Sequence, residues 1–212
     1  MEMMYRPFHF NRARLCGSVY TAPELSHENH GRVFYRFMLS VPRLSGQCDV
    51  LPVIVPQQLL SCTPLRPGDR ICVTGQLRSF NNKSGVGARL VISVLCRTLT
   101  PADSPACNVI RLCGTVCKPP ALRRTPLGRE ICDMILAVNR RYGRADYLPC
   151  IAWGAVAQQT ALLEVGDSFC LEGRIQSRTY TKTLPDGAEE RTAYEVSVMR
   201  PATCEEFFTT GI

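Results

Sequence analysis

The feature that most constrains the fold of this chain is an internal repeat. Residues 14–19 read RLCGSV and return as RLCGTV at 111–116, which is 97 positions later. Other segments recur in the same order at offsets of 97 or 98, and these pairs are 38–43 with 135–140, 49–52 with 146–149, 68–72 with 166–170, and 75–79 with 173–177. Self-similarity at a nearly fixed offset is the mark of a repeated structural unit. We therefore predict two tandem copies of one fold, copy one and copy two.

The ends of the copies follow from the same comparison. Residues 92–94 face 196–198 at an offset of 104, which predicts about six extra residues ahead of the last strand of copy two. Prolines and small polar residues at 101–105 are typical of a linker. We expect one domain at residues 1–100, a linker at 101–105 and a second domain at 106–212.

Alternating apolar and polar residues predict that each copy consists mainly of strands. In copy two, the apolar side chains of residues 169, 171 and 175 share one face with Gly173, and the same period of two recurs at 35–41, 71–77 and 132–138. The Ala-, Gln- and Leu-rich residues 155–163 predict a short helix, while the prolines around 57–61 predict a shorter or absent helix in copy one. The predicted fold class is all-β, with two tandem five-stranded OB-fold barrels, each with a short helix between its third and fourth strands.

Cysteine usage argues against disulfide and metal chemistry. The chain has 12 cysteines but no Cys-x-x-Cys motif, and its three histidines all precede residue 31. Zinc modules usually carry two pairs of ligands two to four residues apart, so we predict no metal site and no cofactor. Most cysteines lie in apolar strand-like segments, which predicts reduced thiols that pack as small hydrophobes in a cytoplasmic protein.

Several classes of protein are excluded at this stage. No apolar run approaches the roughly 18–20 residues that a membrane span requires, so we expect no membrane association. Residues 1–7 lack the basic-then-apolar pattern of a secretory signal. The chain has no phosphate-binding glycine loop and no catalytic constellation of His, Cys or acidic residues, so we predict no catalytic residue and no enzyme activity.

Five stretches of copy two carry a family resemblance, and they are residues 108–114, 125–128, 136–142, 151–154 and 171–180. In these residues, copy two resembles the bacterial single-stranded DNA-binding proteins. Copy one resembles that family weakly, mostly through the repeat. The resemblance implies a non-enzymatic protein that binds and protects single-stranded DNA independently of sequence during replication, recombination or repair. It also implies a bacterial, nucleoid-associated location in the cytoplasm and a homodimer that presents four OB folds.

Binding of single strands without sequence preference requires aromatic faces that stack on bases and cations that follow the phosphates. Copy two supplies both kinds of side chain in alternation. The resemblance places Tyr147, Trp153 and Tyr180 at base-stacking positions, and it places Lys118 and four arginines, Arg140, Arg141, Arg174 and Arg178, at basic ones. The alternation itself adds Tyr142 and Lys182 as candidates. The alternative is that such residues are core aromatics, cross-strand packing partners or ordinary solvated cations.

Copy one lacks most of these aromatics, and its candidates for nucleic-acid contact include Phe34, Arg36 and Phe80. An alternative for its outer face is that Phe34 and Met38 pack against the other OB fold or against a partner subunit. Residues 1–104 hold 12 Lys or Arg against 6 Asp or Glu, whereas residues 105–212 hold 13 against 12. We therefore hypothesise that copy one supplies a diffuse electrostatic path while copy two supplies the stacking.

Two features of copy two depart from the family pattern. The segment 181–190 contains a Pro-Asp-Gly turn signal and is predicted to be a loop that closes over a strand, although its acidic residues would weaken phosphate contacts. Residues 205–208, Glu-Glu-Phe-Phe, follow the last predicted strand without a flexible spacer, which argues against recruitment of replication or repair proteins through an acidic tail. The alternative function is therefore a tail-less accessory OB-fold protein that acts mainly through protein–protein contacts with replication or recombination machinery.

Overall fold

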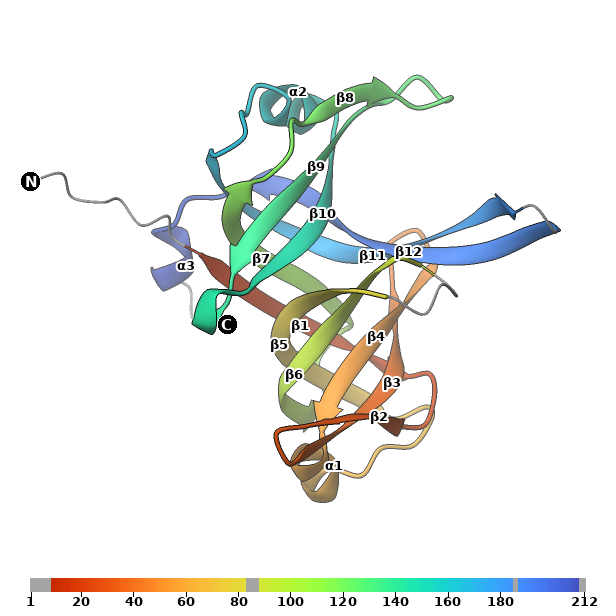
Figure 1. Cartoon of the computed structure of the whole chain (residues 1–212). Coiled ribbons are helices and arrows are strands. Elements are labelled where there is room, and N and C mark those ends of the chain that lie inside the picture. Colours follow the sequence, from red (N-terminus) through yellow and green to blue (C-terminus); the bar gives the residue numbers. More distant parts are fainter. Residues whose placement is uncertain (1–8, 83–87, 185–186, 210–212) are drawn as a thin grey trace, which may run out of the picture. The chain divides into compact units, whose positions relative to one another are not determined.

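The computed structural model describes residues 9–82, 88–184 and 187–209 (Figure 1). Copy one contains β1 (Phe10–Val19), β2 (Glu24–Asn29), β3 (Arg32–Pro42), β4 (Cys48–Pro56), α1 (Gln57–Cys62), β5 (Arg70–Asn81) and β6 (Leu90–Pro101). Copy two contains β7 (Cys107–Val116), β8 (Ala121–Arg124), β9 (Glu130–Asn139), the 3-10 turn η1 (Arg141–Gly143), β10 (Ala145–Trp153), α2 (Ala155–Thr160), β11 (Ser168–Leu184), β12 (Gly187–Pro201) and α3 (Glu206–Thr209). None of the helices in these described ranges is long and apolar enough to cross a membrane.

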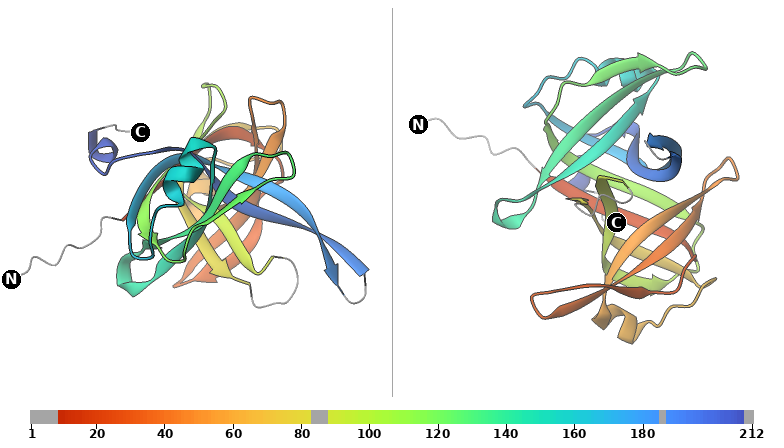
Figure 2. Two further views of the ribbon diagram at one scale, coloured as in Figure 1. Left: turned by 90° about the horizontal axis from the view of Figure 1, so that it is seen from above. Right: turned by 45° about the vertical axis from the view of Figure 1, so that its right-hand side comes forward.

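Each copy closes into a five-stranded barrel, so the predicted pair of OB folds is confirmed. In copy one the hydrogen-bonded ring runs β1-β3-β4-β6-β5, and the parallel β4–β6 pair completes it. Copy two repeats this path as β7-β9-β10-β12-β11, with β10–β12 as the parallel pair. The strands of each barrel can be followed from two directions in Figure 2.

Two details of the predicted secondary structure are wrong. Each copy has a sixth strand, β2 or β8, which pairs only with the edge of β3 or β9. All residues of these two strands are exposed, so they lack the alternation by which the other strands were predicted. Helix α1 is as long as α2, at six residues, because Pro56 precedes its first turn, where a proline interrupts no helical hydrogen bond.

The expected alternation of core residues is confirmed in both barrels. Phe37, Leu39 and Val41 are buried on one face of β3, and the face of β9 from Cys132 to Val138 is buried in the same way. Gly75 in β5 and Gly173 in β11 lie where a Cβ would overlap the carbonyl oxygens of Leu95 and Ser197. Both positions therefore require glycine so that the next strand can approach closely.

Strand pairing also corrects the register of the last repeated segment. Val94 lies beside Val53 in copy one, and Val196 lies beside Cys150 in copy two. Val53 and Cys150 are equivalent positions of the repeat, so Val196 faces Val94 and not Ile92. The insertion in copy two is therefore two residues shorter than the sequence comparison predicts.

Close contacts group the described residues into two units that do not follow the order of the sequence. Of the described residues, unit 1 comprises 9–11, Ile110–Arg174 and 196–209. Unit 2 combines Arg12–Val109 with Ile175–Glu195, which is the outer part of the ribbon formed by β11 and β12. The ribbon of copy two therefore belongs to the same unit as copy one, whereas the expected division at 101–105 follows the repeat alone.

The prediction that all cysteines are reduced is wrong at two pairs. Cys16 is bonded to Cys72 and Cys113 to Cys170. Each pair joins residues that lie directly opposite each other on antiparallel strands, β1 with β5 and β7 with β11. The two partners are 56 residues apart in the first pair and 57 in the second, so no local cysteine motif predicts either disulfide.

Candidate nucleic-acid interface

The outer face of β10 in unit 1 presents two of the predicted stacking residues. Tyr147 is 52% exposed and Trp153 is 37% exposed, while Leu148 and Cys150 between them are buried, as is Asp146 just before them. Residues 147 and 153 have the same parity, so both side chains lie on the outward face of the strand. Neither aromatic ring is part of the buried core, and both are partly exposed to solvent.

Tyr142 lies in the short turn that leads into β10. It has a positive φ of 65°, and its side chain is almost fully exposed. A non-glycine residue in this left-handed region carries a conformational cost that is common at functional turns. The side chain of the neighbouring candidate, Arg141, lies outside what the structure describes.

Arg140 is held by a buried acidic partner. Its Nε donates to Oδ2 of Asp146 at 2.7 Å, and its terminal nitrogen bonds the other carboxylate oxygen. The carboxylate of Asp146 is fully buried. Copy one repeats this pair as Arg43 and Asp49. We call each of these pairs a clasp, and its duplication explains why both residues recur in the repeat.

Two further predicted cations of unit 1 differ in their surroundings. Arg174, in β11, is half-buried, and its Nε atom is buried without a hydrogen-bond partner among the described residues. A buried donor that lacks an acceptor is costly, and an anionic ligand would satisfy it. Lys118 is exposed directly after β7.

The ribbon of unit 2 carries the remaining candidates of copy two. The guanidinium of Arg178 lies 5.5 Å from the centroid of the Tyr180 ring, within cation–π range. Residues 178, 180 and 182 share one face of β11, so Arg178, Tyr180 and Lys182 form a cation–aromatic–cation row. The structure thus brings together three candidates that are only alternate residues in the sequence.

The copy-one clasp fastens this ribbon within unit 2. Ser177 donates from its backbone nitrogen to Oδ1 of Asp49 at 2.8 Å, and Arg43 donates to the Ser177 carbonyl oxygen at 3.1 Å. Burial disfavours the charge of Asp49, but the hydrogen bonds from Arg43 and Ser177 outweigh it and lower the pKa of that carboxyl. The clasp therefore sets the position of the strand immediately before the Arg178–Tyr180–Lys182 row.

The candidates of copy one lie apart from that row in the sequence but in the same unit. Phe80 is 53% exposed near the end of β5, and Arg36 is exposed on β3. Arg36 lies close enough to Tyr194 of β12 to act on its pKa, which burial raises and the arginine lowers, with a net rise. Sequence reasoning missed Tyr194, because a half-buried tyrosine in a strand looks like an ordinary packing residue.

Phe34 has a local contact that the sequence did not predict. The ring of Phe34 stacks on that of His27 from β2, with centroids 5.0 Å apart and an interplanar angle of 8°. Strand β2 was not predicted, so the partner of Phe34 could not be found from the sequence.

The loop expected at 181–190 is mostly strand. β11 continues to Leu184 and β12 begins at Gly187, so only residues 185 and 186, at the predicted turn, lie outside the described residues. On β12, Glu189 is paired with Arg191. One acidic residue of this segment, Glu189, is therefore neutralised by a neighbouring arginine.

Sequence reasoning also missed the cations of β8. Arg123 pairs with Asp133 of β9, and Arg124 pairs with Glu130. Asp133 is the register partner of Ile151, a buried residue two positions before Trp153 on β10. These arginines border the aromatic face, but only the unpredicted strand β8 reveals that position.

Comparison with known proteins identifies similar chains. The chain is 38% identical over 80 residues to single-stranded DNA-binding protein B of Bacillus subtilis, and the match covers 34% of this chain and 71% of that protein. The model of the single-strand binding protein family matches residues 107–201. The chain belongs to the single-strand binding protein family.

Two further relatives match over a similar part of this chain but over less of their own length. The single-stranded DNA-binding protein of Halalkalibacterium halodurans is 33% identical over 99 residues, which cover 43% of this chain and 56% of that protein. The chain spans about half the length of the relative from Listeria innocua, single-stranded DNA-binding protein 2. The family match lies in copy two and ends before residues 202–209, which include α3.

A solved structure extends the likeness to both copies at the level of the fold. The wild-type single-stranded DNA binding protein from Thermus aquaticus superposes with a TM-score of 0.74 at 22% identity, and the match covers 96% of this chain and 95% of that one. The tandem pair of OB folds therefore occurs in another chain of similar length.

Proposed function

We propose that this chain binds single-stranded DNA without regard to base sequence. The observation that carries the proposal is the pair of outward aromatic rings, Tyr147 and Trp153, on a barrel of the single-strand binding protein family. The relatives from B. subtilis and H. halodurans are both named single-stranded DNA-binding proteins. Stacking on such rings suits every base, because each base has a π-face.

Each unit contributes a surface of its own to this function. In unit 1, Tyr142, Tyr147 and Trp153 stack on bases, and Arg174 and Lys118 contact phosphates. In unit 2, Tyr180 stacks while Arg178 and Lys182 contact phosphates, with Phe80 and Arg36 as secondary contacts. Arg140 contributes indirectly through its clasp with Asp146, which holds the turn that carries Tyr142.

The chain acts by coating and protecting exposed single strands during replication, recombination or repair, and not by catalysing a reaction. The excess of positive charge in residues 1–104 supports a diffuse attraction of phosphates by copy one. We also propose that the chain assembles as a homodimer with four OB folds. Light scattering coupled to gel filtration tests this assembly, because a dimer has twice the 23.6 kDa mass of the chain.

A fluorescence titration tests the binding directly, because Trp153 is the only tryptophan of the chain. Oligo-dT should quench its emission, and equal amounts of duplex DNA should not. Higher salt should weaken the effect, because binding releases counterions from the phosphates. Lack of quenching by the single strand at low salt would contradict the assignment of Trp153.

Matched variants separate stacking from general charge. Replacing Trp153 or Tyr180 by alanine should weaken binding of a labelled oligo-dT by about 5- to 150-fold, which corresponds to roughly 1–3 kcal/mol for one stacked base. Tyr20→Ala is the control, since Tyr20 is an exposed aromatic outside the proposed surfaces and should leave affinity unchanged. Phe80→Ala should have a smaller effect, and equal losses in Phe80→Ala and Trp153→Ala would refute the proposed division between the copies.

A further inference from the structure

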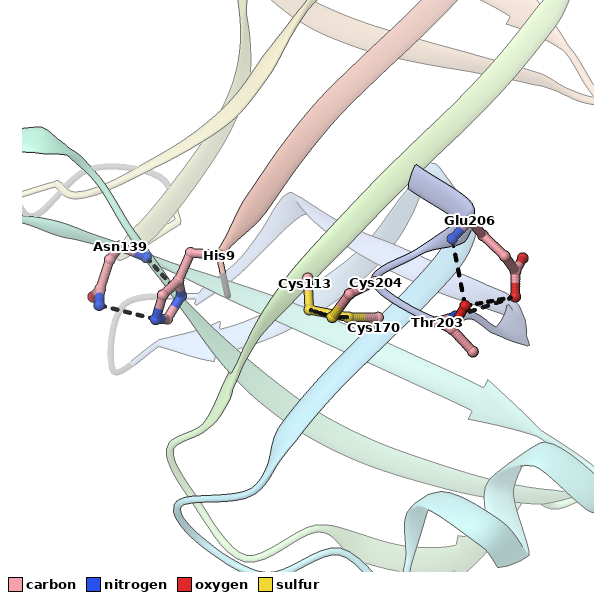
Figure 3. Close-up of a disulfide and its surroundings, with 7 residues drawn as sticks. All are labelled: His9, Cys113, Asn139, Cys170, Thr203, Cys204 and Glu206. Atoms are coloured by element: carbon pink, nitrogen blue, oxygen red, sulfur yellow. Dashed lines mark hydrogen bonds between the residues drawn. A yellow bond between two sulfur atoms is a disulfide. The ribbon is translucent and has the colours of Figure 1, made fainter. Parts of the chain in front are cut away.

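Three sulfur atoms from distant parts of the sequence meet on the outer side of the copy-two barrel. Cys113 and Cys170 form the disulfide between β7 and β11, and Cys204 lies in the segment before α3 (Figure 3). Sγ of Cys204 is 3.3 Å from Sγ of Cys170 and 3.7 Å from Sγ of Cys113. This is the one group of three metal-ligating side chains found among the described residues.

The distances suit a metal once the disulfide is reduced. A tetrahedral ion with metal–sulfur bonds of about 2.3 Å, as for zinc, separates its thiolates by about 3.8 Å. The two distances from Cys204 are already close to that value. Reduction would release Cys113 and Cys170 from each other, and a modest separation of their sulfurs would complete a triangular face of three thiolates.

Copy one contains the same arrangement with one atom changed. Residues 101–104 read Pro-Ala-Asp-Ser and residues 201–204 read Pro-Ala-Thr-Cys, so Ser104 is the equivalent of Cys204. Oγ of Ser104 lies 3.7 Å from Sγ of Cys72 and 3.9 Å from Sγ of Cys16, beside the disulfide of that barrel. A neutral serine hydroxyl is a poor ligand for thiophilic ions, so the third sulfur distinguishes copy two.

The surroundings of the three sulfurs hold Cys204 in place. Phe207 of α3 is buried against Cys113 and Cys170, and Phe10 and Ala202 pack on the same cluster. The rings of Phe10 and Phe207 are 4.9 Å apart. Thr203 and Glu206 bond each other across the start of α3, as in a capping box. Packing and hydrogen bonds around Cys204 therefore hold its thiol in place beside the disulfide.

We propose that the reduced form of this protein binds a thiophilic divalent cation of the zinc class through Cys113, Cys170 and Cys204. A dithiol reductant supplies two electrons and two protons, which convert the disulfide into two thiols while the reductant becomes a disulfide. Metal binding then displaces up to three protons from the three thiols. The three protein ligands leave one position for water or a small anion. The reverse thiol–disulfide exchange, in which an oxidised disulfide takes up the two electrons and two protons, re-forms the Cys113–Cys170 bond, removes two ligands and closes the site.

Cobalt titration of the full chain tests the proposal, because Co²⁺ bound to thiolates has visible and charge-transfer absorption bands. The wild-type chain, reduced with a phosphine and freed of metal, should bind one Co²⁺ that Zn²⁺ displaces. The oxidised chain should show no such bands. Cys204→Ser reproduces the Ser104 arrangement and should lower the affinity by at least about tenfold, since loss of even an outer-shell partner has effects of that size.

The copy-one barrel supplies the gain-of-function control. Ser104→Cys should create a second site beside Cys16 and Cys72, so the reduced variant should bind two Co²⁺ per chain. Circular dichroism of both variants verifies that they are folded. The remaining cysteines are the same in every sample, so they cannot cause a difference between the samples. Thiolate bands of equal strength in reduced wild type and Cys204→Ser, or in the reduced and oxidised wild type, would overturn the proposal.

Discussion

The clasp between Arg43 and Asp49 is the contact whose removal should most affect unit 2. The carboxylate of Asp49 is 1% exposed, and it accepts from Arg43 at 2.5 and 2.7 Å and from Ser177 at 2.8 and 3.2 Å. Asp49→Ala removes all four bonds in one step. It also leaves the Arg43 guanidinium, which is 21% exposed, without its counter-ion.

The expected loss of stability follows from these contacts. Removal of one partner from a buried ion pair typically destabilises by about 3–5 kcal/mol. Arg43 keeps some access to water, so we take the lower end, about 3 kcal/mol. The Ser177 backbone N–H loses its acceptor, which adds about 1 kcal/mol. The free energy of unfolding should therefore fall by about 4 kcal/mol.

Urea unfolding followed by circular dichroism measures this loss, with the disulfides kept intact. Asp103→Ala is the matched control, since Asp103 is an exposed aspartate of the same unit, and its effect should stay within about 0.5 kcal/mol. Asp49→Asn keeps the shape and one acceptor for Ser177, so its loss should be intermediate. A loss below about 1 kcal/mol for Asp49→Ala would refute the reasoning that the clasp stabilises unit 2.

The same variant has a local consequence for the ribbon. Because Asp49 holds Ser177, the strand that follows should open more often when the carboxylate is missing. Hydrogen exchange at residues 177–182 should be faster in Asp49→Ala than in wild type, and exchange in copy two's β9 should be unchanged. Unaltered exchange at 177–182 would mean that other ribbon contacts suffice to position Arg178 and Tyr180.

Three further predictions concern single positions. Gly75→Ala should destabilise the fold by about 1–3 kcal/mol in urea unfolding, since the new Cβ would overlap the Leu95 carbonyl oxygen and the strands would have to separate. In the native chain, iodoacetamide at pH 8 should label the exposed Cys48 long before Cys96, because burial raises the pKa of Cys96 to about 12 and excludes the reagent. The pKa of Asp49 is lowered in the folded protein, so its clasp stabilises the fold at neutral pH. This contribution is lost as the pH falls through the folded-state pKa. The stability difference between wild type and Asp49→Asn should therefore shrink below about pH 4.

The architecture could be predicted because two independent patterns in the sequence agree. The repeat predicted two barrels, and the alternation of apolar and polar residues in segments such as 35–41 and 132–138 predicted their strands. Strands β2 and β8 were missed because a fully exposed strand has no buried face to impose a period of two. The disulfides were missed because partners on neighbouring strands of a barrel, such as Cys16 on β1 and Cys72 on β5, are 56 residues apart in the sequence.

The candidate site was harder to read, because a residue's type does not reveal its partner. An arginine that contacts phosphate and one that is bonded to a buried aspartate are identical in the sequence, and Arg140 is of the second kind in this structure. Arg174 and Arg178 differ from it only in their surroundings, which are a buried Nε without an acceptor and a tyrosine ring. Exposure of Tyr147 and Trp153 agrees with the stacking role that the resemblance implies, and that role stays a prediction.

Comparison of the two copies separates residues that maintain the fold from residues that serve a function. Both barrels share the clasp, the cross-strand cysteine pair and the close-approach glycine, so these features belong to the barrel fold itself. The copies differ where copy two has Tyr147, Trp153 and Cys204, since copy one has valine, proline and serine there. A barrel that closes equally well with either set does not need the copy-two residues for folding. Their presence in one copy alone is what the two proposed ligands would require, namely DNA bases for the aromatic rings and a thiophilic cation for the third sulfur.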